Sequence, residues 1–203
     1  MPYVMKPLAC NPSALKGLSE KLVVSHYENN YGGAVKRLNA IEDSLSTLDF
    51  AAAPVFTVNG LKREQLIAMN SMILHELYFA GLGASDMPKS VRDALVRDFG
   101  SVERWNSEFV AMGKAQGGGS GWVLLTYWHR DGKLVNQWAA DHTCSVSGAT
   151  PVLALDMYEH SYHIDYGAAA AKYVDAFMQN VRWEEVDRRF SAAQRTAVAF
   201  QGG

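Results

Sequence analysis

The sequence is poor in cysteine, has almost no net charge and contains no long apolar run, and each shortage excludes a class of protein. Its two cysteines, Cys10 and Cys144, stand far apart in 203 residues and form no CxxC pattern, so they build neither a disulfide framework nor a zinc knuckle. Nineteen Lys and Arg against 21 Asp and Glu give a formal net charge of −2, which argues against binding to nucleic acid or a membrane surface.

The chain also lacks the marks of export and membrane insertion. Its first residues have no charged start followed by an apolar core, as a secretory signal would. No apolar run approaches the ~20 residues that a membrane span needs. With two cysteines that we expect to stay reduced, the sequence predicts a soluble protein of the cytoplasm.

What the chain does have is hydrophobic residues, at 48 %, and helical periodicity throughout its first half. A first helix is predicted to start at Pro12 and to be broken or kinked at Gly32-Gly33, after which the helical period resumes. A second strong helix lies in "KREQLIAMNSMILHELYFAGLG", with one side formed by Leu66, Met69, Ile73 and Leu77. We expect these helices to form a long antiparallel hairpin.

The second half changes character. Two shorter helices near residues 88–98 and 101–115 precede "QGGGSG", which is either a linker or a tight entry into a strand. Two β-rich runs flank the turn at Arg130-Asp131-Gly132, "TPVLALD" is a third strand, and a helical stretch closes the chain. The fold class is therefore α+β: a helical hairpin domain over 1–86, and over 87–203 a small antiparallel three-stranded sheet flanked by helices.

Three histidines and one carboxylate fall in strongly patterned elements. His26 and His75 lie in the two long helices, and Asp156 ends the third strand four residues before His160. Neutral imidazoles with one carboxylate suit iron or manganese, and facing helices can each direct a histidine inward. Taken singly, each histidine is more often a core or surface residue, and Asp156 alone is more often a turn or cap residue.

The stretch "DMYEHSYHIDY" at residues 156–166 resembles the Asp-x-Trp-Glu-His-x-Tyr-x-x-Asp-Tyr signature of the iron/manganese superoxide dismutases, with Tyr158 at the Trp position. The resemblance extends over nearly the whole chain. Segments similar to those of the family include "SHYENNYGGAVKRLN", "LHELYF", "GGGSGWVLL", "DGKL", "ATPVLALD" and "YVDAFMQNVRWEEV".

The resemblance implies a set of functional residues. One iron or manganese ion per subunit is bound by His26, His75, Asp156 and His160. The resemblance also implies that Tyr78 and Trp122 wall this site. It places Glu159 and His163 at a subunit interface, where Glu159 reaches the His160 of a second copy.

Departures from the family pattern concern the route to the ion. The gateway positions that usually hold His and Tyr are Asn30 and Ala34, and the neighbouring Tyr31 is a candidate to refill part of that space. Neither usual glutamine position holds a glutamine: Ser71 occupies one and His142 the other. We expect His142 to hydrogen-bond the solvent at the metal; the alternative is a surface-loop histidine.

The implied activity is the disproportionation of superoxide to dioxygen and hydrogen peroxide, slower than in typical members and with an altered pH dependence. The alternatives are a dismutase-like metal-binding dimer with little or no activity, another non-haem metal enzyme, or a purely structural helical module. Iron and manganese suit the donors equally, and both a homodimer and a tetramer stay open.

Overall fold

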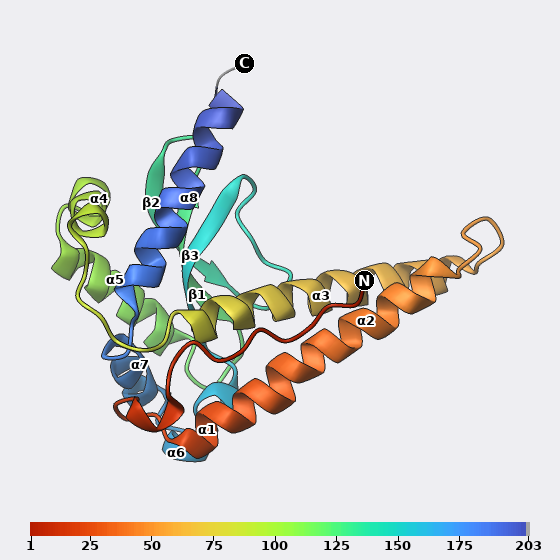
Figure 1. The fold of residues 1–203 in the computed structure, drawn as a ribbon, viewed down its shortest axis with the longest axis horizontal. Helices are drawn as coiled ribbons and strands as arrows, with labels where there is room; N and C mark the ends of the chain where they lie inside the picture. The colour runs from red at the N-terminus through yellow and green to blue at the C-terminus, as the bar shows by residue number, and fades with distance from the viewer. Residues whose placement is uncertain (202–203) are drawn as a thin grey trace.

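The computed structural model describes residues 1–201, with side chains described for residues 1–196 (Figure 1). Its α-helices are α1 (Glu20–Ser25), α2 (Gly32–Ser46), α3 (Val55–Ala80), α4 (Lys89–Phe99), α5 (Val102–Ala115), α6 (His163–Tyr166), α7 (Ala170–Met178) and α8 (Trp183–Gln201). Its other elements are β1 (Trp122–Trp128), β2 (Lys133–Ala139), β3 (Ala149–Asp156), the 3-10 turns η1 (Pro12–Ala14) and η3 (Glu159–Ser161), and the π-helical segment η2 (His26–Tyr31). This arrangement confirms the α+β fold class.

The first long helix is continuous from α1 through η2 into α2, so the predicted break at Gly32-Gly33 is wrong. A single π-helical segment takes its place, a feature that often marks functional sites. The predicted start at Pro12 is also wrong, because Pro12 begins only a short 3-10 turn. The α-helix instead starts after Ser19, whose hydroxyl accepts a hydrogen bond from the Leu22 N–H at 3.1 Å.

Helices α2 and α3 pack against each other and form a long arm that extends from the rest of the molecule (Figure 1). The row of α3 that holds Leu66, Ile73 and Leu77 is not its buried face, since Leu77 is buried but Leu66 and Ile73 are 48 % and 43 % exposed. The buried face lies to one side of that row and follows the helical spacing of Ala68, Ser71, Met72, His75 and Phe79. This face directs His75 into the interior.

The three strands form an antiparallel sheet in the order β2-β1-β3, which confirms the predicted hairpin and third strand. The glycine run is an entry into β1 rather than a linker. Gly121 has a φ of +130°, and a Cβ there would lie 2.2 Å from the Ala139 carbonyl oxygen, so no other residue fits without displacing the backbone. Trp122 pairs with Asp156 in the register, which brings the start of β1 beside the end of β3.

The closing helical stretch is divided into α7 and α8 rather than continuous. Between them the chain pairs with the residues that follow α3: Arg182 N–H donates to the Gly81 carbonyl at 2.7 Å, and Val181 forms a bridge with Leu82. The Asn180 side chain also bonds the Lys16 backbone through both its oxygen and its nitrogen. These contacts join the C-terminal helices to the base of the hairpin.

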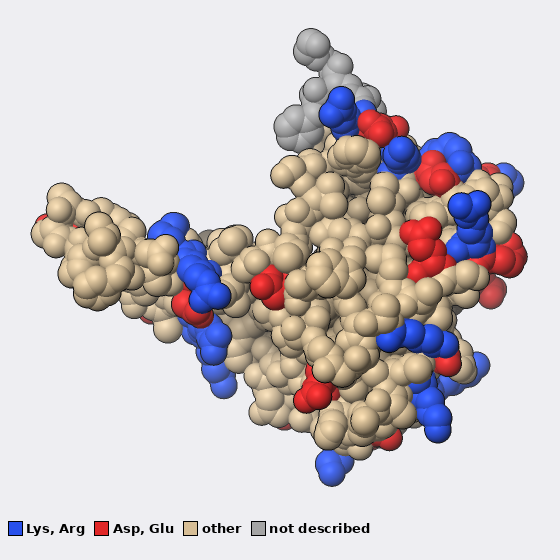
Figure 2. Space-filling model, turned by 180° about the vertical axis from the view of Figure 1, so that it is seen from behind, with Lys and Arg blue, Asp and Glu red and all other residues tan. Residues whose placement is uncertain are grey.

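No helix in the described part of the chain is both long and apolar enough to cross a membrane. On the face seen in Figure 2, basic and acidic side chains are interspersed over the rounded body of the molecule. This distribution agrees with the near-neutral net charge.

Candidate metal centre

Four side chains from separate parts of the chain converge at the base of the hairpin. His26 begins η2, His75 lies in α3, Asp156 is the last residue of β3 and His160 lies in η3. Their ligand atoms all lie within 4.8 Å of one another. The side chains of His26, His75 and Asp156 are at most 1 % exposed, and that of His160 is 25 % exposed. The structure thus brings together the four residues that the resemblance implied.

The carboxylate of Asp156 is the centre of this cluster. Its Oδ2 lies 3.1 Å from His26 Nε2, 3.6 Å from His75 Nε2 and 3.2 Å from His160 Nε2. Its Oδ1 accepts a hydrogen bond from the Tyr158 N–H at 2.8 Å. Asp156 therefore does act as a turn residue, as was expected of it when taken singly. The same turn fixes the position of the carboxylate that faces the histidines.

His75 is held in the tautomer that a metal ligand needs. Its Nδ1 lies 2.7 Å from the Ser71 carbonyl oxygen, which can only accept, so Nδ1 carries the proton. The lone pair is consequently on Nε2, the nitrogen that faces Asp156. A backbone partner of this kind orients and fixes the imidazole of many metal-bound histidines.

Burial keeps the imidazoles of His26 and His75 neutral. It lowers the pKa of His26, against the opposing pull of Asp156, and it lowers the pKa of His75 to about 3. Burial alone would raise the pKa of Asp156, but His160 and His26 outweigh it and hold that pKa well below its usual range. Near neutral pH the site therefore holds two buried neutral imidazoles and one carboxylate.

The two buried Nε2 atoms of this cluster lack hydrogen-bond partners. Neither His26 Nε2 nor His75 Nε2 has a hydrogen bond, although both are enclosed. Unpaired buried polar atoms are costly and rare, and the lone pair of His75 Nε2 faces a carboxylate that repels it. A transition-metal cation would satisfy both nitrogens and the carboxylate at once, so the donor set fits iron or manganese.

Tyr78 and Trp122 form walls around the donors, as the resemblance implied. The Tyr78 ring lies 5.0 Å from the His26 ring, and the Trp122 ring meets the His75 ring edge-on at 5.3 Å. Both aromatic residues are buried, and burial raises the pKa of Tyr78 well above its ordinary value. They exclude water from one side of the cluster.

The structure places His142 next to the donors rather than in an isolated surface loop. The Trp122 indole N–H donates to its Nδ1 at 3.0 Å, so the proton of neutral His142 is on Nε2. Tyr158 stacks on the His142 ring at 4.7 Å and on the His160 ring at 5.4 Å. Sequence reasoning missed this stack, although Tyr158 was noted at the signature's Trp position.

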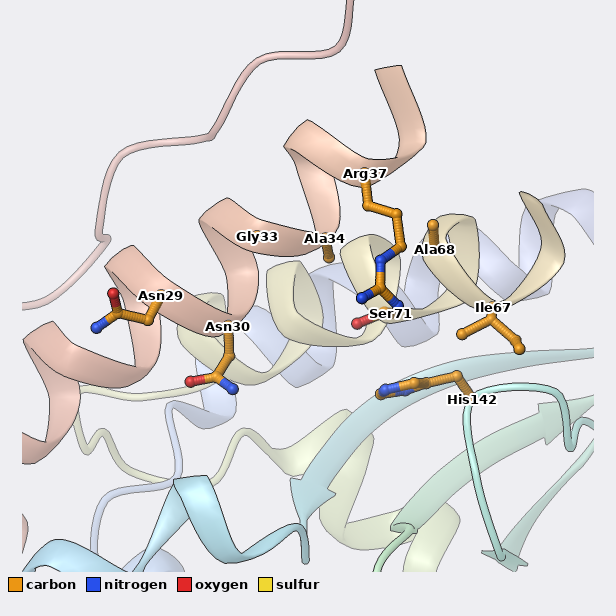
Figure 3. A pocket seen from close by; sticks show the side chains of 9 residues that line it. All are labelled: Asn29, Asn30, Gly33, Ala34, Arg37, Ile67, Ala68, Ser71 and His142. Atoms are coloured by element: carbon orange, nitrogen blue, oxygen red, sulfur yellow. The ribbon is translucent and has the colours of Figure 1, made fainter. Parts of the chain in front are cut away.

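The two altered gateway positions line one cavity of about 230 Å³, together with His142 (Figure 3). Asn30 and Ala34 belong to the first long helix, and Ser71 of α3 and His142 lie across from them (Figure 3). Tyr31 is not among the residues that line this cavity, although its buried ring stacks beside the His75 ring, with 6.4 Å between the ring centres. The Tyr31 hydroxyl accepts from the Lys6 N–H at 2.8 Å and donates to Glu76 at 3.2 Å, and whether Tyr31 refills part of the gateway stays a prediction.

Arg37 also lines this cavity, and sequence reasoning did not identify it. It lies three residues beyond Ala34 on the same helix, so helical spacing alone would have placed both residues on one face. Glu159 and His163 lie on the surface, and their predicted part in a subunit interface stays a prediction.

Comparison with known proteins gives one consistent set of relatives. Residues 87–189 match the family model of the iron/manganese superoxide dismutase C-terminal domain. The chain is 69 % identical to the iron superoxide dismutase of Cupriavidus metallidurans over 196 residues, which is 96 % of this chain and 100 % of the relative. It is 30 % identical to the iron enzyme of Aquifex pyrophilus and 32 % identical to a manganese enzyme of Haloferax volcanii, over 94 % and 95 % of its length and 92 % and 98 % of theirs.

Proposed function

The chain belongs to the iron/manganese superoxide dismutase family, and from this premise we propose that it uses iron, bound by His26, His75, Asp156 and His160, to disproportionate superoxide. The family and the enzyme class follow from the match to the family model and from the relative of 69 % identity. The observation that carries the assignment of the site is the convergence of four ligand atoms, three of them from buried residues, within 4.8 Å of one another.

A bound iron ion supplies one-electron chemistry that no ordinary side chain can perform. In the net reaction, one superoxide is oxidised to dioxygen, and a second takes up that electron and two protons to become hydrogen peroxide. The chain's own residues then have two tasks. They must admit a small anion to the donors, and they must place a proton donor beside it.

His142 suits the second task. Its Nε2–H is selected by the Trp122 hydrogen bond to Nδ1, and its ring is half-buried beside the cavity. Burial lowers the pKa of His142, so the ring is neutral near pH 7 and acts as a hydrogen-bond donor rather than as a cation. We assign it the role of bonding the solvent or anion at the site, in place of the amide used elsewhere in the family. A partner of this kind tunes the reactivity of a bound metal.

Metal identity is the finer part of the proposal. Iron is favoured because the relative of 69 % identity is named as an iron enzyme, while the relatives named as manganese enzymes share about a third of their residues. The test is to prepare the metal-free protein, load it separately with iron and manganese, and measure superoxide consumption per bound ion. We expect the iron form to be the more active, and a faster manganese form would contradict this choice. Two inactive forms would instead support the alternative of a dismutase-like metal-binding dimer with little or no activity.

Quaternary state and compartment are further parts of the proposal. We expect a homodimer in which Glu159 of each copy pairs with His160 of the other, with His163 in the same interface. Glu159→Ala should then weaken the dimer by about 2–5 kcal/mol, as expected for loss of one partner of a buried charged pair. Analytical ultracentrifugation would show monomer at micromolar concentration; an unchanged dimer would exclude this pairing. The two free cysteines support a cytoplasmic location.

A further inference from the structure

The cavity beside the donor cluster carries a single formal positive charge. Among the described residues that line it, most are small or neutral, and Arg37 is the one that is charged near neutral pH. In Figure 3 its side chain reaches from the first long helix toward Ser71 and His142 on the opposite side. The one formal charge of the cavity therefore has the sign that attracts an anion.

Small residues on the arginine's own helix leave space for this side chain. A Cβ added at Gly33 would meet no atom within 4 Å, and the side chain of Ala34 is a single methyl group. Ala34 and Arg37 share a helix face because they are three residues apart. The position that holds an aromatic ring in the family pattern is thus open, and a guanidinium lies at the same opening.

The inner wall of the cavity adjoins the metal donors. Ser71 lines the cavity, and its carbonyl oxygen accepts the hydrogen bond that orients His75. The His142 ring lies 6.2 Å from the His75 ring, centre to centre. An anion that enters this cavity past Arg37 therefore comes close to the side chains that would hold the metal ion.

Among the residues whose side chains the structure describes, Arg37 forms one ion pair, and this pair is weak. Its Nη1 lies 3.7 Å from Glu64 Oε2, and the two side chains are 63 % and 41 % exposed. Exposed pairs at such distances contribute little and exchange readily with water. Glu64 therefore reduces the positive potential at the opening without holding the guanidinium in place.

We propose that Arg37 is an anion-steering residue, which draws superoxide into the cavity lined by Ala34, Ser71 and His142, and that Glu64 moderates this attraction. The inference rests on the proposed function because the anion it names is the substrate of that reaction. Arg37 does not touch the reacting atoms; it acts by raising the local concentration of a monoanion near the donors. It therefore affects the capture of substrate more than the chemical step.

The test compares the iron-loaded parent with Arg37→Gln, Arg37→Lys, Glu64→Gln and Lys36→Gln. Lys36 is exposed on the same helix, next to Arg37, and does not line the cavity, so Lys36→Gln makes the same change of net charge outside it. At low ionic strength we expect Arg37→Gln to lower kcat/KM by about 3- to 10-fold, with kcat unchanged. Arg37→Lys should retain most of the parental value, and Glu64→Gln should exceed it.

Salt supplies the first internal check, because added salt screens an exposed charge. The parent should lose kcat/KM as ionic strength rises, and Arg37→Gln should show a flatter dependence. Equal losses for Arg37→Gln and Lys36→Gln would overturn the proposal, since they would show that only net charge matters. An Arg37→Gln variant with the parental rate and the parental salt dependence would overturn it as well.

Azide binding supplies a readout that needs no turnover. The probe is sodium azide, titrated into each iron-loaded variant and followed by visible absorption; we expect Arg37→Gln to raise its Kd by about 3- to 10-fold, and Lys36→Gln to leave it near the parental value. If the parent binds azide through Arg37 but does not consume superoxide, the proposed function fails and the anion route stands. If azide affinity does not depend on Arg37, the anion route fails whatever the activity.

Discussion

The donor cluster and the cavity beside it lie next to each other but are built on opposite principles. Three of the four donors are buried, all four come from different elements, and the three histidines converge on one oxygen of Asp156. The cavity is lined from the first long helix, α3 and the loop of His142, by small and polar side chains, one of them a largely exposed arginine. One region is fixed by packing, and the other is open to water.

This difference between the two regions indicates where the site tolerates amino-acid substitutions. A change at His75 or Asp156 breaks hydrogen bonds inside a close-packed interior, where each unpaired group is costly. A change at Asn30 or Ala34 alters the size and polarity of the cavity that they line. The departures of this chain from the family pattern at Asn30, Ala34 and Ser71 all fall on this cavity, whereas the four implied donors are intact.

Removal of a donor should have the largest effect. His75→Gln deletes the Nε2 that faces Asp156 and the Nδ1–H that bonds Ser71. We expect loss of bound iron and a fall in activity greater than the roughly 10- to 100-fold seen when residues that merely support a ligand are changed. Elemental analysis and superoxide consumption of the purified variant measure both effects.

A matched control is His129→Gln, which changes a histidine that bonds Thr150 and takes no part in the cluster. This control should keep its iron and most of its activity. If His75→Gln retained a full complement of iron at the parental affinity, the assignment of the donors would be wrong. Circular dichroism separates loss of metal from loss of fold.

Replacement of His142 should have an intermediate effect, since this residue belongs to both regions. His142→Ala removes the Nε2–H beside the cavity but none of the four donors. We expect iron to stay bound, the midpoint potential to shift and turnover to fall by roughly 10- to 100-fold. Redox titration and rate measurement test this, and a variant with the parental potential and rate would refute the role given to His142.

Trp122→Phe tests separately whether the hydrogen bond from Trp122 to His142 matters. It removes the indole N–H that selects the His142 tautomer while keeping an aromatic wall beside His75. If the tautomer matters, the Phe variant should lose part of the activity that the Ala variant loses. A Phe variant with full activity, beside an impaired His142→Ala, would show that the imidazole matters but its hydrogen bond to Trp122 does not.

The sequence predicted the enclosed region better than the open one, for a physical reason. The periodicity of buried residues gave the two long helices, and alternation with turn residues gave the strands. Placement in two facing helices gave the grouping of His26 with His75 only as a weak hypothesis, and the family resemblance made it specific, because no local pattern states that two helices turn their histidines toward the same point. Convergence depends on the crossing of helices and on strand register, which periodicity does not encode.

Errors in the prediction fell where local signals compete. Gly32-Gly33 suggested a break, but packing of the helix against α3 keeps it continuous through a π-helical segment. Tyr31 was placed by sequence nearness to the gateway, yet its hydroxyl bonds Lys6 and Glu76 and its ring lies outside the cavity lining. Arg37 was missed because a charged residue on a helix is usually only a solvated surface residue. Where a side chain points depends on the exact helical phase, and a π-helical segment shifts that phase.

Filling the cavity should have the smallest effect and gives the finest comparison of the two regions. Ala34→Tyr places a phenol in the open space beside His142, and Ala34→Phe places a ring of nearly the same shape without the hydroxyl. Neither change touches a donor, so both variants should bind iron as the parent does. Near neutral pH, both variants should lower kcat/KM by less than about tenfold. The added ring narrows the cavity, but Arg37 still attracts the anion into it.

The kcat/KM values of Ala34→Tyr and Ala34→Phe should differ at alkaline pH. An exposed phenol ionises near pH 10, and a phenolate in this cavity would repel an incoming anion. For Ala34→Tyr, kcat/KM should therefore fall as pH rises through that value, while Ala34→Phe should follow the parent. Identical pH profiles for the two variants would mean that position 34 does not face the path of superoxide, and the cavity would then be a space beside the route rather than the route itself.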